Sequence, residues 1–344
     1  MSALDNCINK LISSKVLTNA AIRAGKGREI LIDSYFSHTD YELCEKTLFD
    51  MASVTKIVAT TTLALIASDK GLLKFSDKVS QYFGVPDDKK ELTVKNLLCH
   101  TMGMGHKNLC ADGVTYGNIA EHILSIPCDV KIGIDYIYSC PAFILLGKIL
   151  EKIYGKRLDA LLREYVSDPL GMTDTGYLPD AENYRFAPCN FRGESYRVND
   201  YNCDFLGGVA GNAGVFSNIA DMTLFAQMLL SEGSPIIESK TFEQAVKNYG
   251  REKFSESRAL GFLYVDKKYT QTGKLFPKGS FGHCGHTGQS VFVHPESGLY
   301  AIVLTDATAT LARASGDLSY DYGIVCDMRK QIHNAIAEDI KNYI

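Results

Sequence analysis

The sequence predicts an α+β protein: an antiparallel sheet flanked by terminal helices, with an inserted helical subdomain. Three observations predict this class. Short apolar runs typical of strands lie near both ends of the chain, helical periodicity dominates the middle, and the last segment is an amphipathic helix. We therefore expect residues 1–74 and 244–344 to form the sheet unit and residues 75–243 to form a mostly helical unit.

The N-terminal elements follow from apolar spacing. A first helix is predicted where four apolar residues recur at helical intervals: Leu4, Ile8, Leu11 and Ile12. Two strands are predicted at residues 20–24 and 30–36, joined through a glycine-containing turn. Residues 55–67 form a helical run that is apolar on nearly every side, so we expect it to be buried in the centre.

The remaining elements are read in the same way. Helices are predicted at residues 93–100, 141–154, 158–166 and 222–230, with Thr93 as an N-cap and Pro141 in a first turn. Strands are predicted at residues 291–294 and 299–305. The final helix carries isoleucine or methionine at every fourth position: Ile324, Met328, Ile332, Ile336 and Ile340.

Composition excludes several classes of protein. The 344 residues are 46% hydrophobic and 22% charged, which excludes a disordered or low-complexity chain. The net charge is −4, so we expect no nucleic acid and no membrane as partner, and a small molecule fits better. We also expect a cytoplasmic location, because no signal peptide or apolar run of about 20 residues is evident. The ten cysteines have no metal-site spacing, so no metal and no cofactor is expected.

The sharpest local motif is Ser53 followed three residues later by Lys56, at the start of the apolar helical run. This spacing places both side chains on one helix face, where the helix N-terminus can stabilise an oxyanion and burial can favour loss of the lysine proton. On its own the motif is weak, because Ser53 could be an N-cap and Lys56 a surface residue.

Further segments occur in an order that makes the pattern specific. They are residues 92–104 (LTVKNLLCHTMGM), 138–140 (YSC), 145–151 (LLGKILE), 169–172 (PLGM) and 207–217 (GGVAGNAGVFS). With them the chain resembles the serine β-lactamase and penicillin-binding-protein superfamily, in particular the class C β-lactamase-like serine hydrolases of the esterase and D-peptidase type. The resemblance implies a β-lactamase/transpeptidase-like fold with the active site in the cleft between the two units.

The resemblance implies that Tyr138 is the general base toward Ser53. Without that context Tyr138 would read as a half-buried aromatic residue. Cys140 stands where the family usually has Asn or Asp, and a thiol is a poor hydrogen-bonding group. The usual contact to the substrate amide or to Lys56 is then weakened or made by another group. Asn212 is a further candidate for a supporting role near the cleft.

The third element of the family is a Lys/His-Thr-Gly strand, for which residues 281–290 (FGHCGHTGQS) offer two registers. His286-Thr287-Gly288 matches by letters. We favour His283-Cys284-Gly285, because a gapless match to related hydrolases extends to Pro295. The backbone N–H of His286 would then join that of Ser53 in an oxyanion hole. The alternative for His283 is an inert residue of an edge strand.

These features predict a serine hydrolase that acts on small ester or amide substrates through an acyl-enzyme on Ser53. β-Lactamase or D-Ala-D-Ala carboxypeptidase activity is the first alternative, and a catalytically inactive binding protein is the second. A Ser-His-Asp triad stays open, although no G-x-S-x-G motif surrounds a serine. The expected partner is a small acyl substrate, and the sequence leaves the oligomeric state open.

Overall fold

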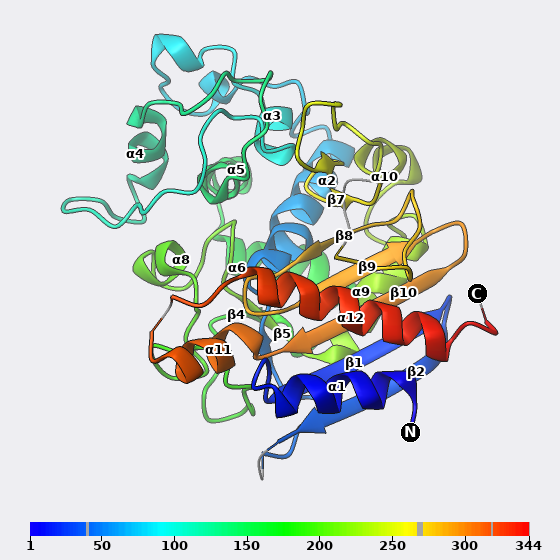
Figure 1. Ribbon diagram of the computed structural model, residues 1–344. Coiled ribbons are helices and arrows are strands. Elements are labelled where there is room, and N and C mark those ends of the chain that lie inside the picture. The colour runs from blue at the N-terminus through cyan, green and yellow to red at the C-terminus, as the bar shows by residue number, and fades with distance from the viewer. Residues whose placement is uncertain (39–40, 267–270, 318, 344) are drawn as a thin grey trace.

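The computed structural model describes residues 1–38, 41–266, 271–317 and 319–343. Its main element is an antiparallel sheet in the order β2-β1-β10-β9-β8-β7-β6, in which Ala20 of β1 pairs with Thr305 of β10 (Figure 1). The strands are β1 Asn19–Lys26, β2 Glu29–Ser37, β6 Ser257–Arg258, β7 Leu263–Tyr264, β8 Phe281–Cys284, β9 Ser290–His294 and β10 Leu299–Thr305. The predicted strands near both ends of the chain are thus confirmed.

Strand β10 carries apolar side chains on both faces of the sheet, so both faces must be packed against other elements. Successive side chains of a strand point to opposite faces. Leu299, Ala301 and Val303 belong to one buried apolar cluster, whereas Tyr300, Ile302 and Leu304 belong to another. Every residue of this strand is buried. The sheet therefore lies between two separate apolar cores.

Helices α1 Ala3–Ser13 and α12 Gly323–Asp339 pack side by side on one face of the sheet, as Figure 1 shows. The carboxylate of Asp339 accepts hydrogen bonds from the Ala3 and Leu4 backbone nitrogens at 2.8 and 2.9 Å, so it satisfies free donors at the start of α1. Helix α9 Ile219–Leu230 covers the opposite face and contacts β1, β9 and β10.

The predicted apolar row of the last helix needs one correction. Ile324 is 38% exposed, and Val325 is buried in its place. An interval of four residues drifts round a helix that has 3.6 residues per turn, so such a row cannot stay on one face throughout. The rest of the predicted row, Met328, Ile332, Ile336 and Ile340, is buried.

The central buried helix is confirmed, but its first part is not α-helical. A 3₁₀ turn at Ala52–Val54 leads into a π-helix at Lys56–Thr61, and helix α2 follows at Thr62–Asp69. All six residues of the π-helix are buried. A π segment is rare and often marks a functional site.

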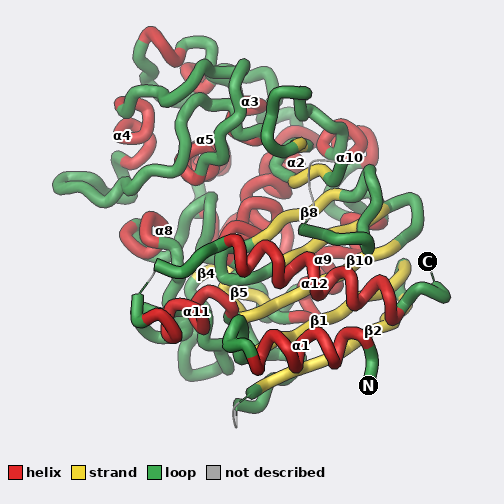
Figure 2. The backbone as a smooth tube through the Cα atoms, viewed as in Figure 1, coloured by secondary structure: helices red, strands yellow, loops and turns green. Residues whose placement is uncertain are grey.

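The middle of the chain contains short helices joined by long loops (Figure 2). The α-helices are α3 Val94–Leu98, α4 Ile119–Ser125, α5 Cys140–Tyr154, α6 Leu158–Leu162, α7 Asp168–Leu170, α8 Tyr201–Phe205 and α10 Ser239–Ala245. Shorter turns lie at Val79–Gln81 and Asp87–Lys89, a π-helix at Arg163–Ser167, and a second sheet contains β3 Phe49–Asp50, β5 Val215–Ser217 and β4 Gly176–Tyr177. The helix predicted to reach residue 100 ends at Leu98.

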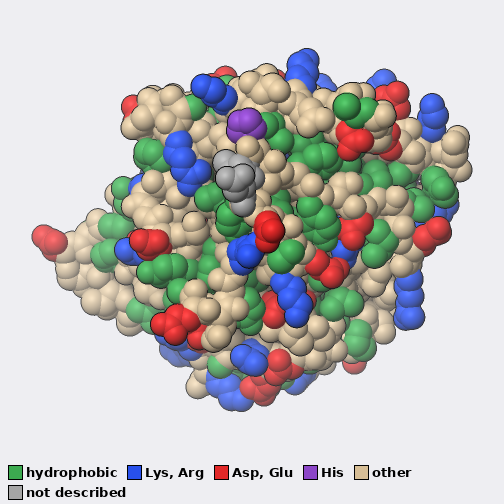
Figure 3. All heavy atoms as spheres, turned by 90° about the horizontal axis from the view of Figure 1, so that it is seen from below, with side chains coloured by type: hydrophobic (Ala, Val, Ile, Leu, Met, Phe, Trp, Pro, Cys, Tyr) green, Lys and Arg blue, Asp and Glu red, His purple; other side chains and the backbone are tan. Residues whose placement is uncertain are grey.

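The division of the chain at residues 74 and 243 stays a prediction. Helix α9 falls inside the range expected to be the helical unit, yet it packs on the sheet. Several elements were not predicted from the sequence: strands β3 to β7, the short helices α4, α7, α8 and α10, and the helix α11 Ala307–Ser315, which follows the last strand. No helix among the described residues is long and apolar enough to cross a membrane. The face seen in Figure 3 carries interspersed acidic and basic side chains.

Candidate active site

Ser53 lies on a tight turn that Asp50 holds in place. Ala52 has a φ of +45°, which is unfavourable for a residue with a Cβ atom. Its backbone N–H donates to Oδ1 of the buried Asp50 at 2.8 Å, and Oδ2 accepts from the backbone of Asn199 at 2.7 Å. Burial raises the pKa of Asp50 to about 6 against the effect of these two donors. The carboxyl group therefore fixes the turn that presents Ser53.

Lys56 is completely buried and lies directly behind Ser53. Its Nζ donates to Ser53 Oγ at 2.8 Å, to the Asn212 carbonyl oxygen at 2.9 Å and to Cys140 Sγ at 3.6 Å. Burial acts to lower the pKa of Lys56, but Cys140 and Tyr138 more than offset this, so that the pKa is raised. The resting group is thus an ammonium ion with three donors in use, and not the neutral amine expected from burial alone.

Tyr138 reaches Ser53 from the other side. Its hydroxyl donates to Ser53 Oγ at 2.9 Å, and its ring lies 4.5 Å from the ring of the buried His100. Burial raises the pKa of Tyr138, while the positive charge of Lys56 acts in the opposite direction. Ser53 Oγ is therefore held between a phenol and an ammonium group.

Cys140 begins helix α5 behind Lys56, and its thiol is only a weak acceptor for the ammonium group. A backbone group, the Asn212 carbonyl oxygen, makes the shorter contact to Lys56. It can reach Lys56 because Gly211 packs against the backbone of helix α5, where an added Cβ would lie 2.0 Å from the carbonyl oxygen of Phe143. Thr60 Oγ1 also donates to the Gly211 carbonyl oxygen at 2.7 Å. The contact that Cys140 makes poorly is thus supplied by the GGVAGNAGVFS segment.

Strand β8 brings the third predicted element to the site. His283 and Cys284 lie on β8, and His286 and Thr287 follow in the turn after the strand. Thr287 Oγ1 donates to the Asp50 carbonyl oxygen at 2.9 Å, and Gln289 Nε2 donates to the same oxygen at 2.8 Å. These two bonds tie the turn to the segment that carries Ser53.

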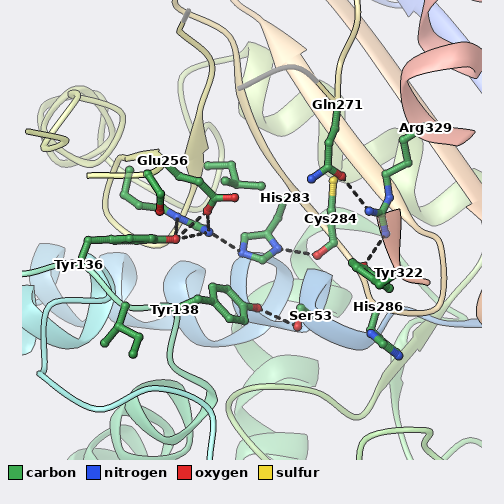
Figure 4. A pocket seen from close by; sticks show the side chains of 14 residues that line it. Ser53, Tyr136, Tyr138, Glu256, Gln271, His283, Cys284, His286, Tyr322 and Arg329 are labelled. Atoms are coloured by element: carbon green, nitrogen blue, oxygen red, sulfur yellow. Dashed lines mark hydrogen bonds and ion pairs between the residues drawn. The ribbon is translucent and has the colours of Figure 1, made fainter. Parts of the chain in front are cut away.

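A pocket of about 460 Å³ opens over Ser53 (Figure 4). Five of the predicted site residues line it: Ser53, Tyr138, His283, Cys284 and His286. Lys56 and Cys140 are buried behind its wall, and Gly285 is buried below the turn. Among the described residues, no group of three or more His, Cys, Asp or Glu side chains could hold a metal ion.

Sequence reasoning missed the polar wall of this pocket. The missed residues are Tyr136, Glu256, Arg258, Gln271, Tyr322 and Arg329. Two of them had a signal in the sequence. In an extended segment, residues two apart point to the same side, and Tyr136 lies two residues before Tyr138. Arg329 is a charged residue among the buried apolar residues of helix α12, between Met328 and Ile332.

Comparison with known proteins assigns the family. The family model Beta-lactamase matches residues 4–321. A protein of Escherichia coli (strain K12) named putative D-alanyl-D-alanine carboxypeptidase is 27% identical over 300 residues, covering 76% of this chain and 69% of its own length.

Two solved structures show the same fold. The octameric penicillin-binding protein homologue from Pyrococcus abyssi has a TM-score of 0.73 at 17% identity, over 91% of this chain and 77% of its own. EstCE1, described as a hydrolase with promiscuous acyltransferase activity, has a TM-score of 0.77 at 15% identity, over 96% and 97%. The chain therefore has a β-lactamase/transpeptidase-like fold and belongs to the Beta-lactamase family, whose members are serine hydrolases.

Proposed function

We propose that this chain is a serine hydrolase that acts on small ester or amide substrates through an acyl-enzyme on Ser53. One observation carries the proposal. Ser53 Oγ contacts both Lys56 Nζ, at 2.8 Å, and the Tyr138 hydroxyl, at 2.9 Å, and it opens into a pocket of about 460 Å³. A serine beside a base and a cation, at the wall of a pocket, is the arrangement of an activated nucleophile.

The acylation step follows from these contacts. When Tyr138 is a phenolate, it accepts the Ser53 proton across the 2.9 Å contact while Oγ attacks the substrate carbonyl carbon. The Lys56 ammonium stabilises the phenolate and remains charged. The tetrahedral oxyanion is bound by the backbone N–H groups of Ser53 and His286. Tyr138 then gives its proton to the leaving alcohol or amine as the bond to that group breaks.

Water completes the cycle. A water molecule in the pocket gives a proton to the Tyr138 phenolate and attacks the ester formed with Ser53. As the second oxyanion collapses, the bond between the carbonyl carbon and Ser53 Oγ breaks, Tyr138 returns the proton to Oγ, and the acid leaves. Each step uses groups of the chain itself, with Cys140 and Asn212 holding Lys56 in place.

D-Ala-D-Ala carboxypeptidase or β-lactamase activity is the second candidate. It is favoured by the name of the Escherichia coli relative and by the guanidinium group of Arg329 on the pocket wall, which would attract the carboxylate of a D-peptide or a penicillin. A binding protein without activity is the third candidate, and the intact contacts of Ser53 argue against it.

The test is intact-mass spectrometry after exposure to a fluorophosphonate, a panel of short acyl esters and a penicillin, with Ser53→Ala as the control. We expect a Ser53-dependent adduct with the fluorophosphonate, rapid turnover of esters, and slow acylation by penicillin. Rapid acylation by penicillin would favour the second candidate. If the wild-type protein gains no mass with any reagent, the proposed nucleophile is wrong and the binding protein takes its place.

A further inference from the structure

Arg258 is a buried cation on the pocket wall for which the steps above give no role. It ends the short strand β6, and its side chain is only 3% exposed. Its Cζ lies 5.3 Å from the centroid of the Tyr138 ring. A charge at this distance acts strongly when protein surrounds it, because little water screens it.

Arg258 also fixes the state of His283. Its Nη1 lies 3.3 Å from His283 Nε2, and His283 Nδ1 lies 2.7 Å from the carbonyl oxygen of Cys284 (Figure 4). A guanidinium group can only donate, so Nε2 must accept, and Nδ1 must carry the proton that is donated to the carbonyl. Burial holds the pKa of His283 well below its usual range, and the charge of Arg258 adds to this effect. His283 is thus a neutral imidazole in one defined tautomer.

Glu256 and Tyr136 complete the cluster. Arg258 Nη2 donates to Glu256 Oε2 at 2.6 Å and to the Tyr136 hydroxyl at 2.9 Å. That hydroxyl in turn donates to Glu256 Oε2 at 2.6 Å. The Glu256 side chain is 31% exposed. The cation faces the pocket, while its counter-ion is partly in water, where its own charge is better screened.

We propose that Arg258 is a positioning residue, which stabilises the Tyr138 phenolate by its charge and holds His283 as a neutral wall of the pocket, with Glu256 setting how much of that charge Tyr138 experiences. This inference rests on the proposed function, in which Tyr138 is the base. The inference predicts opposite effects of two substitutions on the Tyr138 phenolate: removing Arg258 disfavours the phenolate, and neutralising Glu256 favours it.

Other groups also face Tyr138 and must be kept constant in the test. They come from the buried π-helix, the start of α5, the turn after α3 and strand β8, and are Lys56, Cys140, His100 and His283. None of these four residues is substituted in the variants below. A shift that is seen only when Arg258 or Glu256 is altered is therefore assigned to the cluster.

The experiment measures the second-order rate at which a fluorophosphonate phosphonylates Ser53, with loss of fluoride, from pH 5 to 12. Wild type is compared with Arg258→Met, Arg258→Lys and Glu256→Gln. Arg163→Met removes the same charge from a side chain that is 79% exposed, and it is the matched control. We expect the midpoint of the pH profile to rise by about one unit in Arg258→Met, to fall in Glu256→Gln, and to return toward wild type in Arg258→Lys. Arg163→Met should leave it unchanged.

The outcomes separate the two proposals. Absence of Ser53-dependent phosphonylation in the wild type overturns the proposed function. Phosphonylation in the wild type with the same midpoint in every variant overturns the role of Arg258 alone. If Arg258→Met does not fold, Glu256→Gln still decides, because a midpoint that stays constant or rises in that variant contradicts the inference.

Discussion

Gly285 packs against the backbone of Met51, two residues before the nucleophile. A Cβ atom on Gly285 would lie 2.6 Å from the Met51 carbonyl oxygen, closer than real Cβ atoms come to a neighbouring atom. Only glycine therefore lets the end of β8 lie this close to the turn that carries Ser53. The relationship explains why a glycine follows His283 and Cys284 in the predicted triplet.

Gly285→Ala should separate the two segments. We expect the rate of Ser53 acylation to fall at least about tenfold and the free energy of unfolding to fall by about 1–3 kcal/mol, because the added methyl group must displace backbone. Acylation is followed by intact mass and stability by urea unfolding. Gly84→Ala is the control, since nothing lies within 4 Å of its added Cβ. Equal activity of the two variants would contradict the expectation.

Lys56 and Cys140 should differ sharply in importance. Lys56→Met should lower kcat/KM for a short ester by roughly 10²–10⁴-fold, because it removes the cation beside Ser53 and Tyr138. Cys140→Ala should lower it by no more than about threefold, because the Asn212 carbonyl and Ser53 still hold Lys56. Steady-state kinetics of both variants provide the check. A loss of about 100-fold in Cys140→Ala would instead give the thiol a direct part in proton transfer.

His333 should make the protein sensitive to acid. It is fully buried, its Nε2 lies 3.3 Å from Ser290 Oγ, and burial lowers its pKa to about 3. The unfolded chain binds a proton at this residue below about pH 6.5 and the folded chain does not, so its contribution to stability is lost as the pH falls. The loss is about 1.4 kcal/mol per pH unit between about 6.5 and 3. In His333→Gln the free energy of unfolding should fall less steeply with decreasing pH, whereas the exposed His38→Gln should follow wild type.

The contribution of Asp50 to the free energy of unfolding should depend on pH in the opposite direction. Its pKa is raised to about 6 by burial, so the folded chain retains a proton that the unfolded chain has already lost. Its contribution to stability is present at low pH and is lost as the pH rises from about 4 to about 6, by about 3 kcal/mol in all. The stability of Asp50→Asn relative to wild type should therefore increase over that range in urea unfolding. Asp112→Asn, at an exposed site, is the control and should show no such trend.

Local patterns predicted the two terminal helices, the central helix and the long strands, because apolar spacing reflects burial. The run at residues 55–67 and the strand at 299–305 are buried as expected. Strands β6 and β7 contain two residues each and were missed, since two residues show no periodicity. They are strands only through their pairing, of β6 with β7 and of β7 with β8, and this pairing depends on the whole fold and not on the local sequence.

The candidate site also contains residues that the sequence predicted and residues that it did not. Ser53, Lys56 and Tyr138 were found because their spacing and motifs are specific, and the structure brings all three together. Arg258 was missed because nothing near it in the chain indicates that it will meet His283 and Tyr138. The Asn212 backbone contact could not be predicted from residue type, because every residue has a carbonyl group.

The pairing of β1 with β10 has a consequence for the newly made chain. Ala20 pairs with Thr305, so at about 5–20 residues per second the partner strand leaves the ribosome roughly 15–60 s after β1. During this time the hairpin of β1 and β2 has an open edge that could pair with another molecule. Arg23 lies in the middle of that edge strand and can act as a gatekeeper against aggregation until β10 arrives.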